Sequence, residues 1–320
     1  MPGKITDVPG IGVGHAHDAR GRTGVTVILC DPPAVGGIDR RGAAVSTRQC
    51  DSLLPEHLLS RVDAVVLTGG SAFGLGASSG VMDVLAERGI GMPSPGRPVP
   101  IVPTAALFDL GFGAGDAFPT PELARQAALG AGDEVGQGSV GAGYGATVGK
   151  VLGIGAAMKG GVGTASRTRD DGLIVGALAA VNAWGDVVNP ETGAIIAGAR
   201  DLDGEGLFAD TARVLVDRPK RGLKGFMFDN TVLVVVATNA KLEKNFAGFV
   251  ARMAQTGLAR AVRPCHGPFD GDVVLALGMG DKPADLPAIG QMAADAVAEA
   301  IVRAAVLADG FGVLPAVRDL

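Results

Sequence analysis

Aromatic residues are scarce in this chain, which has one tryptophan and one tyrosine against 51 glycines in 320 residues. Charge is also modest, with a net charge of −5. A nucleic-acid surface requires a basic patch, so this balance argues against a nucleic-acid partner. The high apolar content excludes an intrinsically disordered chain. The length suits one large domain or two ordinary ones.

Long apolar runs are absent too. No stretch is both apolar and long enough to span a bilayer, and residues 1–8 lack the apolar core of a signal peptide. The three cysteines, Cys30, Cys50 and Cys265, are odd in number and widely spaced, which indicates neither a disulfide framework nor a zinc site. We therefore predict a cytoplasmic protein with no membrane partner.

The histidines offer little for metal binding. They are His15, His17, His57 and His266. His15 and His17 flank one alanine, but no Cys, His or carboxylate partner stands nearby at a familiar ligand spacing. We interpret the histidines as surface or hydrogen-bonded loop residues, and we predict no metal and no cofactor.

The stretch from residue 226 to residue 240 is the most informative part of the chain. Residues 231–237 form an unbroken β-branched and aliphatic run, which favours a strand buried on both faces over a helix. The pair Asn230-Thr231 stands at its head. If that peptide is cut, Thr231 gains an α-amine that titrates at about pH 8 in model compounds and can accept the hydroxyl proton. The alternative is that Thr231 merely begins a core strand.

Hydrophobic periodicity predicts an alternating set of strands and helices. The expected strands are residues 23–30, 64–67, 99–102, 173–181, 231–237 and 273–277. The expected helices are residues 53–60, 81–87, 121–129, 242–262 and 284–307, and Thr120 is the expected cap of the third. In helix 242–262 the apolar stripe consists of Phe246, Phe249, Val250 and Met253. The polar, glycine-rich residues 190–225 are expected to form a mobile surface connection.

Two glycine-rich loops invite a nucleotide-binding interpretation. In the first, the spacing of Gly74, Gly76 and Gly80 misses the dinucleotide-binding pattern, and close packing of a helix on a sheet explains the glycines better. In the second, Tyr144 replaces the first glycine of a phosphate loop, and a valine follows Lys150 where Ser or Thr should stand. Lys150 is then either a surface lysine or one that the glycines hold in a crowded interior.

Polar residues at the ends of two apolar runs are further candidates. Asn182 ends the strand 173–181 and is either a turn residue or a hydrogen-bond donor aimed at a site. Asp270 and Asp272 flank a glycine before the strand 273–277. Such a pair can ligate a metal, cap a turn, or share a proton as a coupled acid pair.

These motifs together resemble the P1 family of aminopeptidases, which groups D-aminopeptidases, L-aminopeptidase/esterases, β-aminopeptidases and nylon-oligomer (6-aminohexanoate oligomer) hydrolases. The resemblance rests on Asn230-Thr231 before an apolar strand, with Asp270-Gly271-Asp272 about forty residues further on. Four other segments carry it as well: residues 11–15, 67–71, 141–150 and 181–182.

The resemblance implies a role for each matching residue. Thr231 matches the nucleophile, and Asn230 the residue left at the new C-terminus after self-cleavage. Asn182 matches an oxyanion donor. The remaining matches are to the site of the nylon-oligomer hydrolases: Lys150, Asp270 and Asp272. Phe108 stands where many members have a tyrosine, and it cannot donate a hydrogen bond; Phe108 and Tyr144 are the candidates for the substrate pocket.

The implied fold is α+β: a four-layer αββα sandwich, like that of the N-terminal-nucleophile hydrolases but with the strand connectivity of its own family. A single domain, 1–320, would be autocleaved into 1–230 and 231–320 and would assemble as a homotetramer. The implied activity is hydrolysis of small peptides or ω-amino-acid oligomers through an acyl-enzyme. The alternatives are a stereoselective aminopeptidase/esterase, an acyl transferase resembling ornithine acetyltransferase, and a nucleotide-binding or scaffold protein.

Overall fold

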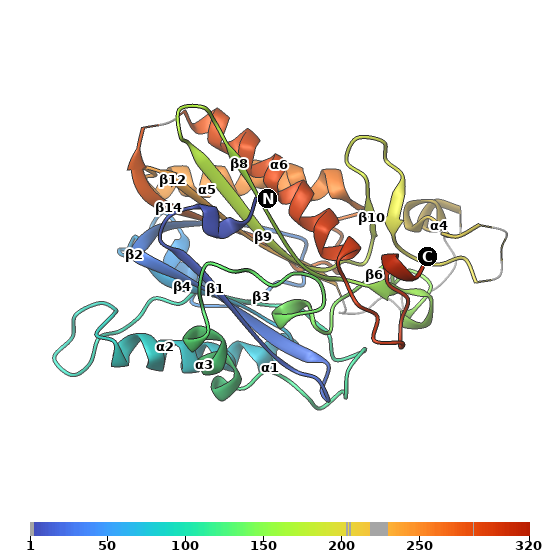
Figure 1. Cartoon of the computed structure of the whole chain (residues 1–320), viewed down its shortest axis with the longest axis horizontal. Coiled ribbons are helices and arrows are strands. Elements are labelled where there is room, and N and C mark those ends of the chain that lie inside the picture. The colour runs from blue at the N-terminus through green and yellow to red at the C-terminus, as the bar shows by residue number, and fades with distance from the viewer. Residues whose placement is uncertain (1–2, 203, 205, 218–229, 284) are drawn as a thin grey trace.

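The computed structural model describes residues 3–202, 204, 206–217, 230–283 and 285–320, and two layers of strands lie between two layers of helices (Figure 1). The strands are β1 (Ile11–Asp18), β2 (Thr23–Arg41), β3 (Ser46–Arg48), β4 (Arg61–Thr68), β5 (Thr104–Ala106), β6 (Thr147–Val148), β7 (Met158–Lys159), β8 (Gly161–Thr168), β9 (Ile174–Asn182), β10 (Asp186–Val188), β11 (Ile195–Ala197), β12 (Thr231–Ala240), β13 (Val262–Arg263) and β14 (Asp272–Lys282). The helices are α1 (Ser71–Gly74), α2 (Ser78–Glu87), α3 (Pro121–Leu129), α4 (Thr211–Asp217), α5 (Lys244–Ala261) and α6 (Leu286–Val306). Short 3-10 turns are η1 (Ile5–Asp7), η2 (Cys50–Leu53), η3 (Leu75–Ala77), η4 (Gly141–Gly143), η5 (Ile154–Ala156) and η7 (Val317–Asp319).

One long strand joins the two strand layers. The order along the sheet is β3-β5-β4-β2-β14-β12-β9-β8, and β1 pairs with β2. The first part of β2 pairs with β1 and β4, whereas residues 35–41 pair with β14. β2 therefore belongs to both layers and carries the chain from one to the other.

Three hydrophobic clusters fill the spaces between four layers. One lies between α5, α6 and the strands β8, β9 and β12; a second lies between the two strand layers; a third lies under α2 and α3. Along β12, Val234 and Val236 belong to the first cluster, while Leu233 and Val235 belong to the second. This alternation explains why residues 232–237 of the strand are all apolar. The predicted α+β, four-layer αββα sandwich is confirmed.

Glycines allow the layers to approach closely. A Cβ on Gly163 of β8 would lie 2.0 Å from the carbonyl oxygen of Ala300 in α6. A Cβ on Gly80 of α2 would lie 1.8 Å from the carbonyl oxygen of Pro121 in α3. Gly80 therefore allows close packing, but between two helices and not between a helix and a sheet, as was expected for this glycine-rich segment.

Several predicted elements are confirmed and others are wrong. The helix 121–129 forms as α3, and the Thr120 side chain accepts a hydrogen bond from the Leu123 backbone N–H at 3.3 Å. The strand predicted over residues 23–30 forms as part of β2 and is not the first strand of the chain, because the glycine-rich residues before it form β1. Residues 53–60 contain no helix beyond the end of η2, and Pro55 interrupts the helical pattern there. The strand expected at 99–102 instead forms as β5, a few residues later.

The helix predicted over residues 242–262 forms as α5, but its buried face agrees with the predicted stripe only in part: Val250 is buried, whereas the two phenylalanines are not. Phe246 and Phe249 are each 44% exposed. The residues that face the core are smaller: Ala247, Val250, Ala251, Ala254, Leu258 and Ala261. Alanines suit this face because it packs against another alanine-rich helix, α6.

The polar segment expected to be a surface connection contains regular structure in its described part, namely β11 and α4. Part of the segment lies outside the described residues, namely residues 203, 205 and 218–229. The expected mobility of the segment therefore stays a prediction.

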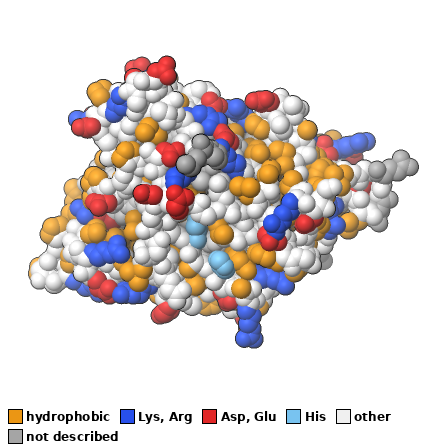
Figure 2. Space-filling model, in the orientation of Figure 1, with side chains coloured by type: hydrophobic (Ala, Val, Ile, Leu, Met, Phe, Trp, Pro, Cys, Tyr) orange, Lys and Arg blue, Asp and Glu red, His pale blue; other side chains and the backbone are white. Residues whose placement is uncertain are grey.

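Surface character agrees with the composition. On the described part of the face in Figure 2, acidic, basic and hydrophobic side chains are interspersed. None of the helices in the described ranges combines the length and the apolar character that a bilayer crossing requires.

Gly163→Ala should destabilise the fold. The added methyl group meets backbone atoms of α6 at 2.0 and 2.5 Å, which cannot move without shifting the helix. Overpacking of this kind costs about 1–3 kcal/mol, measurable as a lower midpoint of thermal unfolding. Gly132→Ala is the matched control, because nothing lies within 4 Å of its Cβ position. Equal midpoints for both variants would contradict the packing argument.

Candidate active site

The register of three strands places the predicted site residues at one end of the sheet. β12 runs antiparallel to β9, so Thr231 at its start lies opposite Asn182 at the end of β9. β12 runs parallel to β14, and a bridge pairs Asn230 with Asp270 just before the two strands begin. The start of β12 is therefore flanked by Asn182 on one side and by Asp270 and Asp272 on the other.

The Thr231 side chain is buried beside the peptide that precedes it. Its exposed fraction is 4%, and its Oγ1 donates a hydrogen bond to the carbonyl oxygen of Asn230 at 2.5 Å. The next residue is held as well, because the Val232 backbone N–H donates to Asp272 Oδ1 at 2.8 Å. The hydroxyl of Thr231 and the Asn230–Thr231 peptide thus lie together in a site from which bulk water is largely excluded.

The two carboxylates are buried and organise the turn before β14. Asp270 Oδ2 accepts a hydrogen bond from the Gly267 backbone N–H at 2.7 Å. Asp272 Oδ2 accepts one from the His266 backbone N–H at 3.1 Å, and it lies 2.8 Å from His266 Nδ1. The turn-capping role considered for this pair is therefore real.

The same carboxylates also interact electrostatically. Burial, followed by the nearby charge of Asp272, raises the pKa of Asp270 from 3.8 to about 6, against the opposing effects of the Gly267 N–H, Lys150 and His266. Asp270 is therefore protonated over part of the mildly acidic range. Within the described residues, no cluster of three or more His, Cys, Asp or Glu side chains is arranged to hold a metal ion.

Lys150 lies in the interior and not on the surface. It is 7% exposed, and its Nζ donates to the backbone carbonyl and to the Oδ1 of Asn182, each at 3.0 Å. Gly149 before it has φ +71, and a Cβ there would lie 2.0 Å from the backbone nitrogen of Ala199. Glycine is therefore required at this position for the backbone to carry the lysine inward.

The Asn182 side chain is held on both sides of its amide. Its Oδ1 accepts the Thr147 backbone N–H at 2.9 Å in addition to Lys150, and its Nδ2 donates to the Phe108 carbonyl oxygen at 2.8 Å. The contacts fix the orientation of the amide at the end of β9.

The two pocket candidates differ in their surroundings. Phe108 is half-buried and lines a small pocket with Thr147 and Lys150, next to the Thr231 end of the sheet. Tyr144 is stacked between His17, at 4.2 Å between ring centroids, and Phe311, at 4.8 Å. Phe108 therefore borders the site, whereas the Tyr144 ring is part of an aromatic stack whose contact with substrate stays a prediction.

Two residues near the site were not predicted to contribute. His266 is the hydrogen-bonded loop histidine that was expected, but its partner, Asp272, could not be named from the sequence. Lys159 is fully buried and donates to the carbonyl oxygens of Gly143, Ala146 and Gly160. Burial lowers its pKa from 10.5 to about 7, although nearby Asp109 and Asp309 act in the opposite direction. The sequence does contain a signal that could have identified Lys159 as buried, because this lysine stands inside a run of alanine, methionine and glycine.

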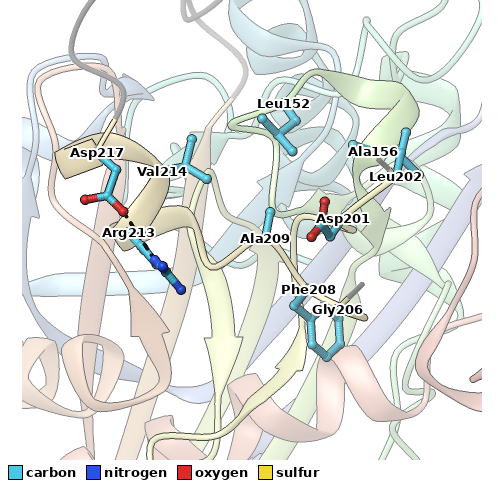
Figure 3. Close-up of a pocket in the computed structure, with 10 residues that line it drawn as sticks. All are labelled: Leu152, Ala156, Asp201, Leu202, Gly206, Phe208, Ala209, Arg213, Val214 and Asp217. Atoms are coloured by element: carbon cyan, nitrogen blue, oxygen red, sulfur yellow. Dashed lines mark hydrogen bonds and ion pairs between the residues drawn. The ribbon is translucent and has the colours of Figure 1, made fainter. Parts of the chain in front are cut away.

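A separate hollow lies away from these residues. It has a volume of about 560 Å³, and Arg213 and Asp217 are paired at 3.2 Å on one wall (Figure 3). The residues that line it are Leu152, Ala156, Asp201, Leu202, Gly206, Phe208, Ala209, Arg213, Val214 and Asp217. None of its ten lining residues is a predicted site residue.

Asp270→Asn should change how folding stability depends on pH. The folded-state pKa of about 6 exceeds the ordinary 3.8, so between these values the folded protein holds a proton that the unfolded chain has released. Stability should therefore fall as pH rises through this window, and the fall should be smaller in the variant, which has no such proton. Urea unfolding of the two proteins measures the difference, and both carry Thr231→Ala so that the predicted self-cleavage cannot affect the comparison. Asp281→Asn removes an exposed carboxylate and is the control; identical curves for all three proteins would refute the raised pKa.

Known proteins resemble this chain over nearly its whole length. The model of peptidase family S58 matches residues 3–313. An uncharacterized aminopeptidase of Mycobacterium tuberculosis is 40% identical over 343 aligned residues, covering 99% of this chain and 97% of that protein. A 6-aminohexanoate-oligomer endohydrolase of Paenarthrobacter ureafaciens is 27% identical over 282 residues, covering 85% of this chain and 73% of the relative.

A solved structure shares the fold. The L-aminopeptidase D-Ala-esterase/amidase of Ochrobactrum anthropi, described as a variant of the N-terminal-nucleophile hydrolase fold, superposes with a TM-score of 0.71 at 21% identity, covering 97% of this chain and 88% of that one. The family match and the sequence relatives confirm the resemblance that the motifs predicted. The chain belongs to peptidase family S58 and is a hydrolase of amide bonds.

Proposed function

We propose that this hydrolase cuts its own Asn230–Thr231 peptide and then uses Thr231 as an N-terminal nucleophile on small amide substrates. The observation that carries the proposal is the position of the Thr231 hydroxyl, 2.5 Å from the carbonyl oxygen of the preceding residue and flanked by Asn182 and the acid pair. The chain 1–320 is one domain in this proposal, and cleavage divides it into 1–230 and 231–320.

Self-cleavage is an acyl shift followed by hydrolysis. Thr231 Oγ1 attacks the carbonyl carbon of Asn230, the carbon–nitrogen bond breaks, and the hydroxyl proton passes to the departing nitrogen. The product is an ester between Asn230 and Thr231 Oγ1, with an α-amine on Thr231. Water adds to the ester, which leaves a carboxylate on Asn230 and restores the Thr231 hydroxyl.

The same oxygen then attacks substrates. The α-amine of Thr231, with a pKa of about 8 in model compounds, accepts the hydroxyl proton and delivers it to the leaving amine. Asp270 and Asp272 hold this amine, and the positive charge of Lys150 favours its neutral form. Asn182 donates to the oxyanion of the substrate, and water releases the acid from the acyl-enzyme.

The substrate is proposed to be a small peptide or a short ω-amino-acid oligomer. The pocket beside Phe108 is small, and a relative is named for hydrolysis of 6-aminohexanoate oligomers. The more similar relatives are named aminopeptidases, which favours a stereoselective aminopeptidase as the second candidate. An acyl transferase would pass the acyl group to an added amine, so product analysis with and without such an amine separates the two reactions.

The location and assembly are proposals as well. All three cysteines are unpaired, which supports a cytoplasmic location. The family resemblance supports a homotetramer of cleaved protomers. Native mass spectrometry of the purified protein would reveal the assembly directly.

The first test is the cleavage itself. Mass spectrometry of freshly purified protein should find two chains, 1–230 and 231–320. Thr231→Ala should stay intact and inactive, because the hydroxyl is lost, whereas Thr231→Ser should retain part of both activities. An intact wild-type chain that is still active after long incubation would disprove the proposal.

The second test concerns Asn182 and Phe108. Asn182→Asp keeps the oxygen that accepts from Thr147 and Lys150 but loses the N–H donors, so the turnover number should fall about a hundredfold with a modest change in KM. Phe108→Tyr adds a hydroxyl beside the site and should raise turnover on amino-acid amides.

Thermal unfolding of each variant serves as the control for folding. If Phe108→Tyr changes neither the wild-type rate nor the Asn182→Asp defect, Phe108 only packs against the pocket wall and has no part in substrate selection.

A further inference from the structure

The carbonyl oxygen of Asn230 is held by a backbone donor. The Gly271 N–H donates to it at 3.0 Å, in continuation of the parallel pairing between β12 and β14. We propose that this Gly271 N–H stabilises the oxyanion during self-cleavage, so that Gly271 is a catalytic residue for processing. The inference rests on the self-cleavage proposed above.

Two bonds from the start of β14 bracket the Asn230–Thr231 peptide. Gly271 binds the carbonyl before the bond, and the carboxylate of Asp272 accepts the N–H of Val232 after it, at 2.8 Å. A donor already at hydrogen-bond distance from the oxygen on which charge will develop needs no reorganisation during the reaction. The peptide to be cut is therefore oriented at both ends before the attack.

The second donor on this oxygen is lost as the reaction starts. In the resting arrangement Thr231 Oγ1 also donates to the Asn230 oxygen, at 2.5 Å. When Oγ1 gives up its proton and forms the bond to the carbonyl carbon, it ceases to be a donor. Of the two donors that the described residues provide, the Gly271 N–H is the one that remains on the tetrahedral intermediate.

The Asn182 amide is placed to donate to a carbonyl oxygen other than that of Asn230. Its amide lies across the β9 side of Thr231 and donates to the Phe108 carbonyl oxygen, whereas the Asn230 oxygen faces β14. One nucleophile would then use two oxyanion donors: Gly271 for its own peptide and Asn182 for substrates.

The position also requires glycine. A Cβ on residue 271 would lie 2.9 Å from Thr231 Oγ1 and 2.6 Å from the carbonyl oxygen of Ala44. Ala44 cannot retreat without cost, because its N–H donates to the Asp270 carbonyl oxygen at 3.0 Å. Only the absence of a side chain lets the N–H approach the peptide beside the nucleophile.

The direct test replaces the Gly271 N–H with an ester oxygen. Cell-free translation with glycolic acid at position 271 removes the donor without adding atoms to the side chain. The first-order rate of conversion of the full chain into 1–230 and 231–320 should fall about a hundredfold. Glycolic acid at Gly278, at the far end of the same strand, is the control and should cleave at the normal rate.

Gly271→Ala provides a second test that needs no unnatural residue. It keeps the N–H but displaces Thr231 Oγ1, so processing should slow at least tenfold. Gly248→Ala, with nothing within 4 Å of its Cβ position, should process normally. Circular dichroism and thermal unfolding establish that each variant folds. The alanine pair tests whether the position requires glycine, and the ester variant tests the N–H donor itself.

The outcomes separate this inference from the one it rests on. A wild-type chain that never cuts at Asn230–Thr231 overturns the proposed function. Normal cutting in wild type together with a normal rate in the ester variant overturns the role of the Gly271 N–H alone. A normal rate in Gly271→Ala overturns the requirement for glycine at this position. A 1–230 chain lighter by one water would show that the Asn230 side chain had cyclised, and it would overturn both the attack by Thr231 and the role of Gly271.

Discussion

The pairing of β12 with β9 and β14 is the constraint on which the rest of the site depends. Because β12 is antiparallel to one neighbour and parallel to the other, its first residue meets the end of β9 and the start of β14 together. A slip of one residue would turn the Thr231 side chain to the other face of the sheet. The register is locked by apolar side chains that alternate between two cores, Leu233 and Val235 in one and Val234 and Val236 in the other.

Buried charge near this point is stabilised by hydrogen bonds. Lys150 is bound by two oxygens of Asn182, Lys159 by three backbone carbonyls, and Asp272 by the N–H groups of Val232 and His266. An ionised group in a low-dielectric interior is costly unless such partners satisfy it. The partners also fix the position of each charge, so the electrostatic environment of Thr231 is set by the folded backbone.

Small residues allow these segments of the backbone to approach one another closely. Gly149 carries Lys150 inward, Gly271 brings the start of β14 against Thr231, and Gly163 allows β8 to pack against α6. Aromatic residues are scarce and the facing sides of α5 and α6 are rich in alanine, and both features allow close packing. Four layers can approach one another closely only when few large rings separate them.

The sequence by itself determined the nucleophile candidate, the acid pair and the asparagine at a strand end, because each depends on a local apolar pattern or on a short motif. The four-layer fold class followed from the family resemblance that these motifs carry. The sequence also placed α3 with its Thr120 cap, since capping is a local interaction. Only the tertiary structure decided that Lys150 is interior, that α5 buries alanines while Phe246 and Phe249 stay exposed, and that His266 and Gly271 join the site. These outcomes depend on which strands become neighbours and how closely they approach, and such long-range contacts leave no periodic signal in the chain.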